Sequence, residues 1–434
     1  MSNSNVFNSL FQPISDLSAN IFARKCNELS DYHFIELGVL RVLSDNGSGR
    51  EFSQMASLDG LTNVSTSHLF KSLNSKRRLK HLMQEENKIA KDANKFLSPY
   101  DIFSQFKELE GFDLFASDGT YIEWACHDEK FEKKDKKTTD ERKEAHIGTK
   151  RSCQNFYSFN LRSQTVRHLT VAHIGGERQK EHDMHALKRL SHDELRYGAK
   201  KGRKVLYVYD KAGIDIHQWE KWKKQGGIYF LSREKENQLL DLVEHKPFDK
   251  LDPINSGIIS DESVENILGV PCRRVTYRCS ISGNTFVFLT NLPYSVRPGL
   301  IALLYKFRWS VEKVYDVFKN KLAETKAWAT SETAKTMQAK FICLTYNLSL
   351  MMSKKIELEE NLKYEYDIKR KTKELKIKQA ELDAKGELYP STWELCLRVT
   401  QLPQKFYRWL RVFIRKNTSW CEAIAKLRVL YVSN

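Results

Sequence analysis

The order of strand-like and helical segments is the feature that most constrains how this chain folds. A run of apolar and aromatic residues occupies 112–124, and two more strand-like stretches lie within 154–176. A helical segment follows at 177–202, and further strand-like runs occupy 203–210 and 226–233. This succession of strands and helices predicts a mixed α/β domain.

Helical segments flank this region on both sides. Residues 1–105 carry apolar side chains at three- and four-residue spacing, and the chain is again mostly helical from Pro298 onward. Alternating residues on both sides of Gly283 predict a hairpin within a β-rich insertion at about 234–297. We therefore expect a helical domain at 1–105, an α/β domain at 106–355 that contains the insertion, and a basic helical domain at 356–434.

The net charge limits the classes of partner. The chain has a formal charge of +16 and a pI of about 9.3. An excess of this size indicates a polyanion, either nucleic acid or an acidic membrane surface, and we favour nucleic acid. No apolar run reaches roughly 18 residues, so we expect no membrane-spanning helix. Eight cysteines without a Cys-x2-Cys pair, and an N-terminus without a signal-peptide pattern, predict a cytoplasmic protein.

A cluster of cations near the N-terminus is the first candidate DNA contact. A Ser/Thr-rich stretch able to cap a helix precedes Lys71, Arg77 and Arg78. A short helical bundle that ends in a basic helix suits DNA binding of the helix-turn-helix kind. A basic helix face is equally common as solvated surface, so both interpretations stand.

The segment 305–319, "YKFRWSVEKVYDVFK", separates into two faces when it is placed on a helix. At ~100° per residue, a phenol, a guanidinium, a carboxylate and an ammonium share an arc of roughly 60°. These groups belong to Tyr305, Arg308, Glu312 and Lys319. An apolar stripe on another side predicts the buried face: Phe307, Val311, Val314, Phe318 and Leu322. Arg308 and Glu312 alone could be a surface i,i+4 ion pair.

Two acids at the ends of strand-like runs complete a possible catalytic set. The first run reaches Asp118 at a predicted strand-to-turn boundary, and the run at 203–210 ends at Asp210. Together with Glu312 they supply three carboxylates, the hard oxygen ligands that Mg²⁺ prefers. Two Mg²⁺ ions held in this way support in-line phosphoryl transfer, while neighbouring cations hold the DNA phosphates.

Other residues compete for these assignments. Asp113 precedes Asp118 at the start of the same run, and Asp215 fits a helix N-terminal acid. Glu181, His182, Asp183 and His185 form a cluster that is more typical of a helix surface than of a metal site. Trp219 and Trp222 are expected in the core. Trp309 suits either packing or DNA contact, and Arg233, at the end of a strand, suits either phosphate contact or solvent.

The helical pattern resembles the signature of the insertion-sequence-4 family of bacterial DDE transposases, Tyr-x2-Arg-x3-Glu-x6-Lys. Tyr305, Arg308, Glu312 and Lys319 match every spacing. The resemblance implies a ribonuclease-H-like core with Asp118 on the first strand and Asp210 after the fourth. Lys211 stands where the family often has Arg. The insertion has no Trp, so Tyr277, Phe286 or Phe288 would have to stack a flipped base.

The resemblance also implies a function. It predicts a DNA transposase that binds the terminal inverted repeats of its element, cuts the element ends and joins the 3′-hydroxyls to target DNA. It implies two Mg²⁺ ions, with Mn²⁺ able to substitute, and a homodimer that joins two DNA ends in the cytoplasm, on the nucleoid. The predicted DNA contacts are Tyr305, Arg308, Lys319, Trp309, Lys211, Arg233, Lys71, Arg77 and Arg78. The alternatives are a nuclease without strand transfer and an inactive DNA-binding repressor.

Overall fold

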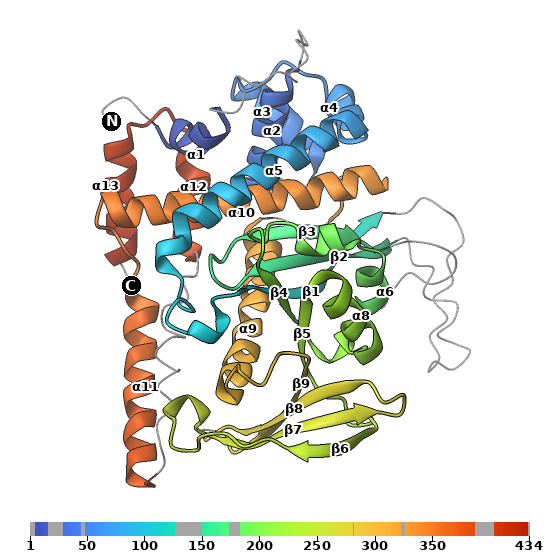
Figure 1. Ribbon diagram of the computed structural model, residues 1–434. Coiled ribbons are helices and arrows are strands. Elements are labelled where there is room, and N and C mark those ends of the chain that lie inside the picture. Colours follow the sequence, from blue (N-terminus) through green and yellow to red (C-terminus); the bar gives the residue numbers. More distant parts are fainter. Residues whose placement is uncertain are drawn as a thin grey trace, which may run out of the picture.

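The computed structural model describes most of the chain. The described residues are 5–15, 29–44, 48–125, 150–172, 183–280, 282–322, 326–386 and 403–432. The predicted charged insert between strands, at about 129–151, lies mainly outside these ranges. Within them, a central mixed sheet is covered by helices, as Figure 1 shows. The predicted mixed α/β fold is confirmed.

One mixed sheet organises the described residues. Its strands lie in the order β3-β2-β1-β4-β5-β9-β8-β7-β6. Strands β1, β4 and β5 are parallel to one another, whereas every other neighbouring pair is antiparallel. The strands are β1 Phe112–Ala125, β2 Lys150–Asn160, β3 Val166–Val171, β4 Lys204–Val208, β5 Ile228–Arg233, β6 Leu240–His245, β7 Ile258–Asn266, β8 Pro271–Arg278 and β9 Thr285–Thr290.

The β-rich insertion extends this sheet instead of forming a separate one. Strand β9 pairs with β5, from Leu231 opposite Thr290 to Arg233 opposite Phe288. The predicted hairpin joins β8 to β9, and Gly283 there has a φ of +68°, a conformation that glycine adopts readily. Figure 1 shows strands β6 to β8 at the end of the sheet farthest from β3.

Serine caps begin the N-terminal helices, as the Ser/Thr-rich sequence predicts. The side chains of Ser30, Ser48, Ser65 and Ser75 each accept a hydrogen bond from a first-turn amide. The longer helices are α1 Val6–Ser15, α2 Asp31–Leu43, α3 Gly49–Leu58, α4 Thr66–Leu73, α5 Lys76–Leu97, α8 Ile216–Gly226, α9 Pro298–Lys321, α10 Glu332–Glu359, α11 Tyr366–Ala384, α12 Gln404–Phe413 and α13 Trp420–Val432. Two short helices are α6 Asp183–Lys188 and α7 His192–Arg196.

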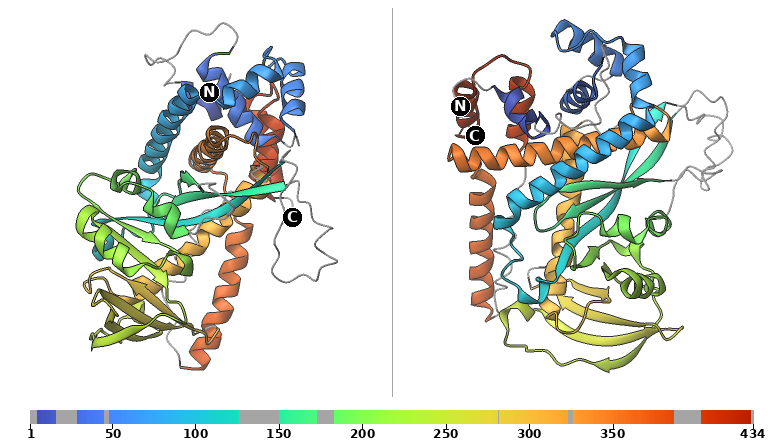
Figure 2. Two further views of the ribbon diagram at one scale, coloured as in Figure 1. Left: turned by 90° about the vertical axis from the view of Figure 1, so that its right-hand side faces the viewer. Right: turned by 45° about the horizontal axis from the view of Figure 1, so that its top comes forward.

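Helix α10 joins the N-terminal helices to the sheet. It lies beside α5 and along β3, as both views of Figure 2 show. Its Asn347 amide bonds both the N–H and the C=O of Val166 at 2.9 Å and so covers the edge strand of the sheet. On its other side, Phe341 packs so closely on α2 that a Cβ at Gly38 would lie 2.1 Å from the ring.

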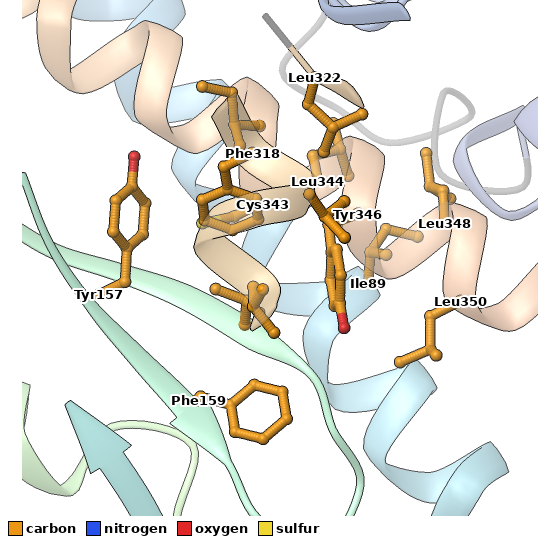
Figure 3. Packing of buried hydrophobic residues seen from close by; sticks show 14 of the residues in the cluster. Ile89, Tyr157, Phe159, Phe318, Leu322, Cys343, Leu344, Tyr346, Leu348 and Leu350 are labelled. Atoms are coloured by element: carbon orange, nitrogen blue, oxygen red, sulfur yellow. The ribbon is translucent and has the colours of Figure 1, made fainter. Parts of the chain in front are cut away.

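Helix α9 packs on the same side of the sheet. Phe318 from α9, Tyr157 and Phe159 from β2, and Cys343 from α10 meet in one core, shown from close by in Figure 3. This core also includes residues of α1, α2 and α5. The N-terminal helices therefore share a hydrophobic core with α9, α10 and the sheet. Among the described helices, none is both long enough and apolar enough to cross a membrane.

Candidate active site

The pairing of β1 with β4 brings the first two acids to the same level of the sheet. The parallel register ends with Ala116 opposite Val208. Asp118 and Asp210 each lie two residues farther along their chains. Because the two strands run in parallel, the two acids leave the paired region at equivalent places.

Asp118 is not at a strand end, contrary to the prediction. Strand β1 continues to Ala125 and stays paired with β2, with Asp118 opposite Tyr157. Only the pairing with β4 stops before Asp118. The apparent strand-to-turn signal at Gly119 has another cause. A Cβ there would lie 2.2 Å from the Gln154 side-chain nitrogen, so a larger residue at this position would require Gln154 to move.

Asp210 is fixed by its own local structure and by β5. Its carboxylate accepts a hydrogen bond from the amide of Ala212 at 2.8 Å and so caps the 3₁₀ turn Lys211–Gly213. Its main-chain carbonyl accepts a bond from the Ser232 hydroxyl at 2.5 Å. Asp210 thus follows β4, as predicted, and these two bonds hold it there.

The predicted helix at 305–319 is confirmed as part of α9. Its predicted apolar stripe is buried in full, and it contacts the sheet and α10: Phe307, Val311, Val314, Phe318 and Leu322. The pattern of apolar residues therefore correctly indicated which side of the helix faces the core.

Arg308 bridges two of the predicted catalytic acids. Its guanidinium donates to Glu312 at 2.8 Å and lies 3.5 Å from the Asp118 carboxylate. The Arg308 side chain is only 8% exposed. Burial alone would lower the pKa of Arg308, but the hydrogen bond to Glu312 and the nearby negative charges raise it. Arg308 therefore faces the acids in this structure, and its contact with DNA stays a prediction.

Tyr305 of α9 lies beside the β-rich insertion. It is half-buried, and its ring packs 4.9 Å from that of Phe288 in β9. Burial raises the pKa of Tyr305; the positive charge of Arg308 lowers it, and the negative charge of Asp210 raises it. The charges of Arg308 and Asp210 thus both act on the Tyr305 hydroxyl.

Two other members of the α9 motif are accessible. Trp309 is 59% exposed, so its side chain is not part of the core. Lys319 is exposed near the end of the helix. Exposure leaves both side chains able to meet a ligand in this structure.

Two further predicted DNA contacts already have partners. Lys211 lies 3.7 Å from the Glu236 carboxylate, and both side chains are largely solvated. Arg233, at the end of β5, places its guanidinium 5.0 Å from the centre of the Phe286 ring. These are weak contacts in or beside solvent, and neither removes the cation from the surface.

The N-terminal cations differ from one another. Lys71 is exposed on α4, whereas Arg77 forms two hydrogen bonds with the buried Asp31, at 2.5 and 2.7 Å. Arg78 is buried and donates to the carbonyl of Leu29 at 2.8 Å. Arg78 thus has a packing role in this structure, and its contact with DNA stays a prediction.

The competing acids have structural roles. Asp113 is buried and accepts bonds from the Lys200 amide at 2.7 Å and from Arg203 at 3.2 Å. Asp215 caps α8 and pairs with Lys188 at 2.5 Å, as its position after Asp210 predicted. Burial would raise the pKa of Asp215, but the bonds from Lys188 and the helix amide lower it.

The predictions for the tryptophans and for the histidine cluster have different outcomes. Trp219 and Trp222 are buried and stack on Phe230, so their predicted place in the core is confirmed. In the histidine cluster, Glu181 and His182 lie outside the described residues, as does the Asp183 side chain, and His185 is exposed.

Sequence reasoning missed Tyr315. This side chain of α9 is buried, and its hydroxyl donates to the main-chain carbonyl of Asp118 at 2.5 Å. A signal was present in the sequence, because Tyr315 lies three residues after Glu312 and seven after Arg308, which places it on the same side of the helix.

The donor set suits a hard divalent cation. Asp118, Asp210 and Glu312 offer carboxylate oxygens from three separate elements, which is the chemistry that Mg²⁺ or Mn²⁺ requires. Among the described side chains, no three from His, Cys, Asp and Glu are gathered closely enough to form a complete metal site. Arg308 supplies the positive charge between Asp118 and Glu312 instead.

Comparisons with known proteins found one family model and one similar protein. The model of the family described as "Transposase DDE domain" matches residues 112–348, from the start of β1 into α10. The chain is also 27% identical over 151 residues to "Putative transposase y4zB" of Sinorhizobium fredii (strain NBRC 101917 / NGR234). That alignment covers 33% of this chain and 41% of the relative, so the chain spans about two fifths of the relative's length. Because the family match covers more than half of the sequence, this chain belongs to the transposase DDE domain family.

Proposed function

We propose that this protein is a DNA transposase of the insertion-sequence-4 type. It would bind the terminal inverted repeats of its own element, cut the element ends and join the freed 3′-hydroxyls to target DNA. The observation that carries the proposal is the Arg308 bridge. It brings Glu312 of α9 to Asp118 of β1, at the level where β4 leads into Asp210.

Asp118, Asp210 and Glu312 would hold two Mg²⁺ ions, with Mn²⁺ able to substitute. When bound, such ions stabilise the charge on the attacking and leaving oxygens of a phosphoryl transfer. The order β3-β2-β1-β4-β5, with β1, β4 and β5 parallel, supports a ribonuclease-H-like core within the sheet. The helical match to the family signature, from Tyr305 to Lys319, supports the more specific family.

The accessible residues would position DNA. Lys319 and Lys211 are cations near the acids, and exposed Trp309 offers a ring on which a base can stack. Arg233 and Tyr305 lie beside the aromatic residues Phe286 and Phe288 of the insertion. We propose that these side chains, which come from α9, the end of β5 and the 3₁₀ turn, contact the same duplex end.

The helical regions would serve binding and assembly. We propose that 1–105 contacts the terminal repeats, with exposed Lys71 and partly exposed Arg77 toward the phosphates. The 356–434 region would contact DNA or a second copy of the chain. Its helix α11 carries mostly exposed side chains and extends along one side of the molecule in both Figures 1 and 2. A homodimer on the cytoplasmic nucleoid would then hold two ends together.

The test begins with DNA fragments that carry the repeats flanking the coding sequence. Footprinting should show protection of those repeats, and Mg²⁺ should then produce strand cuts at their ends. Precleaved ends should be joined to a target plasmid. Cutting without joining would instead indicate a nuclease, and protection without any cutting would indicate a repressor.

A further inference from the structure

Tyr315 lies on α9 between the buried apolar stripe and the face that carries Arg308 and Glu312. It follows Arg308 by seven residues and Glu312 by three, so all three side chains lie on one side of the helix. Tyr315 is only 7% exposed. Its hydroxyl therefore meets the protein interior and must find a partner there.

That partner is the main chain of a proposed catalytic acid. The Tyr315 hydroxyl donates to the Asp118 carbonyl at 2.5 Å. The Tyr315 ring lies 5.9 Å from Tyr157, the residue paired with Asp118 in β2, and 6.1 Å from Phe318. Figure 3 shows Tyr157 extending from β2 beside Phe318. Packing thus fixes the phenol on both sides.

The bond acts where the sheet gives β1 least support. Pairing of β1 with β4 ends at Ala116, so Asp118 has β2 on one side and no β4 neighbour on the other. Tyr315 ties this stretch of β1 to the helix that carries Glu312. The bond uses the main-chain carbonyl of Asp118, whereas the Gly119 amide and Arg308 face its carboxylate oxygens.

We propose that Tyr315 is a positioning residue that sets the separation of Asp118 from Glu312 for metal binding. This inference rests on the proposed function of the two acids. Metal ligands must be held to within roughly 0.5 Å, and loss of a supporting hydrogen bond typically lowers metal affinity about 10- to 100-fold. Tyr315 performs this support without contact to the metal or the DNA.

The test compares Tyr315→Phe with a matched variant. Tyr207 is also buried, and its hydroxyl donates to the Leu195 carbonyl at 2.7 Å, in the core on the α8 side of the sheet. Tyr207→Phe therefore removes a bond of the same kind in a different core from that of Tyr315, although Tyr207 lies on the strand that leads to Asp210. Mn²⁺ binding to the DNA-free protein is followed by electron paramagnetic resonance, and end cleavage is measured across a Mg²⁺ titration.

We expect Tyr315→Phe to weaken Mn²⁺ binding by about 10-fold and to require more Mg²⁺ for half-maximal cleavage, with excess Mg²⁺ restoring the rate. Tyr207→Phe should leave both titrations unchanged. The inference is overturned if the two variants behave alike in these titrations, whether both shift or neither does. Glu312→Gln distinguishes failure of the Tyr315 inference from failure of the proposed function. If Glu312→Gln still cuts DNA, the assignment of the acids is itself wrong.

Discussion

Replacing Arg308 with Met tests the ion pairs that Arg308 forms with Asp118 and Glu312. Met keeps most of the side-chain volume and removes the guanidinium that Asp118 and Glu312 share. Without metal, the two carboxylates then face each other with no cation between them. The folded state should lose stability, and a divalent cation should recover more of it than in the wild-type protein.

The expected size follows from the burial of the three groups. At an effective dielectric constant of ~20, opposite charges ~4 Å apart attract by about 4 kcal/mol, before the desolvation of the guanidinium is subtracted. Breaking a buried pair costs about 3–5 kcal/mol and an exposed one about 0–1 kcal/mol. Arg308 is 8% exposed, Asp118 21% and Glu312 39%, which lies between these limits. We therefore expect a loss of about 1–3 kcal/mol.

Thermal unfolding in EDTA and in Mg²⁺ measures the effect. An unfolding entropy of ~2 cal/mol/K per residue converts that loss into a Tm lower by about 1 to 3 °C for this chain. Lys369→Met, which removes an exposed i,i+4 pair with Glu365 on α11, is the control and should change Tm very little. Mg²⁺ should raise the Tm of Arg308→Met more than that of the wild type. A variant as stable as the wild type in EDTA, or an equal response to Mg²⁺, would refute the reasoning.

Three other predictions test separate parts of the structure. Burial and the positive charge of Lys340 hold the pKa of His168 well below its usual range, so below pH ~6.5 only the unfolded state gains its proton. The free energy of unfolding should therefore fall by up to about 1.4 kcal/mol per pH unit on acidification. In denaturant titrations at pH 5 to 7, His168→Gln should make this pH dependence shallower. An equal pH dependence in the variant and the wild type would contradict the role of His168. Gly38→Ala should destabilise the protein by about 1–3 kcal/mol, because the added Cβ would clash with Phe341. If the N-terminal helices share the core, the unfolding midpoint should shift equally whichever spectroscopic probe follows it. Trp309→Ala should change stability by less than about 0.5 kcal/mol yet weaken binding of DNA ends in gel-shift assays, whereas equal binding would remove Trp309 from the DNA contacts.

The sequence allowed the elements to be predicted better than their long-range contacts. The periodicity around Glu312 correctly identified α9 and its buried stripe, because helix amphipathicity is a local property. The strand-like runs before Asp118 and Asp210 predicted β1 and β4. Their register, however, depends on which strands become neighbours, and the extension of β1 past Asp118 follows from pairing with β2.

A local sequence pattern could not predict the role of a residue whose partner lies far away in the sequence. Arg78 looks like Lys71 in the sequence, but it meets Leu29 across 49 residues and is buried. Tyr315 looks like another aromatic residue of the stripe, but its hydroxyl bonds to Asp118 across 197 residues. A helical wheel gives the direction of a side chain and not the group that it meets.

The central claim is that Glu312 is a catalytic acid for DNA cleavage. The direct measurement is Mg²⁺-dependent cutting of repeat-bearing DNA by Glu312→Gln, with Asp316→Asn as the control. Asp316 lies one turn farther along α9, is exposed and bonds Asn320 at 2.6 Å. We predict that Glu312→Gln binds the ends but makes no cuts, whereas Asp316→Asn cuts like the wild type. Cutting by Glu312→Gln at the wild-type rate would contradict the account.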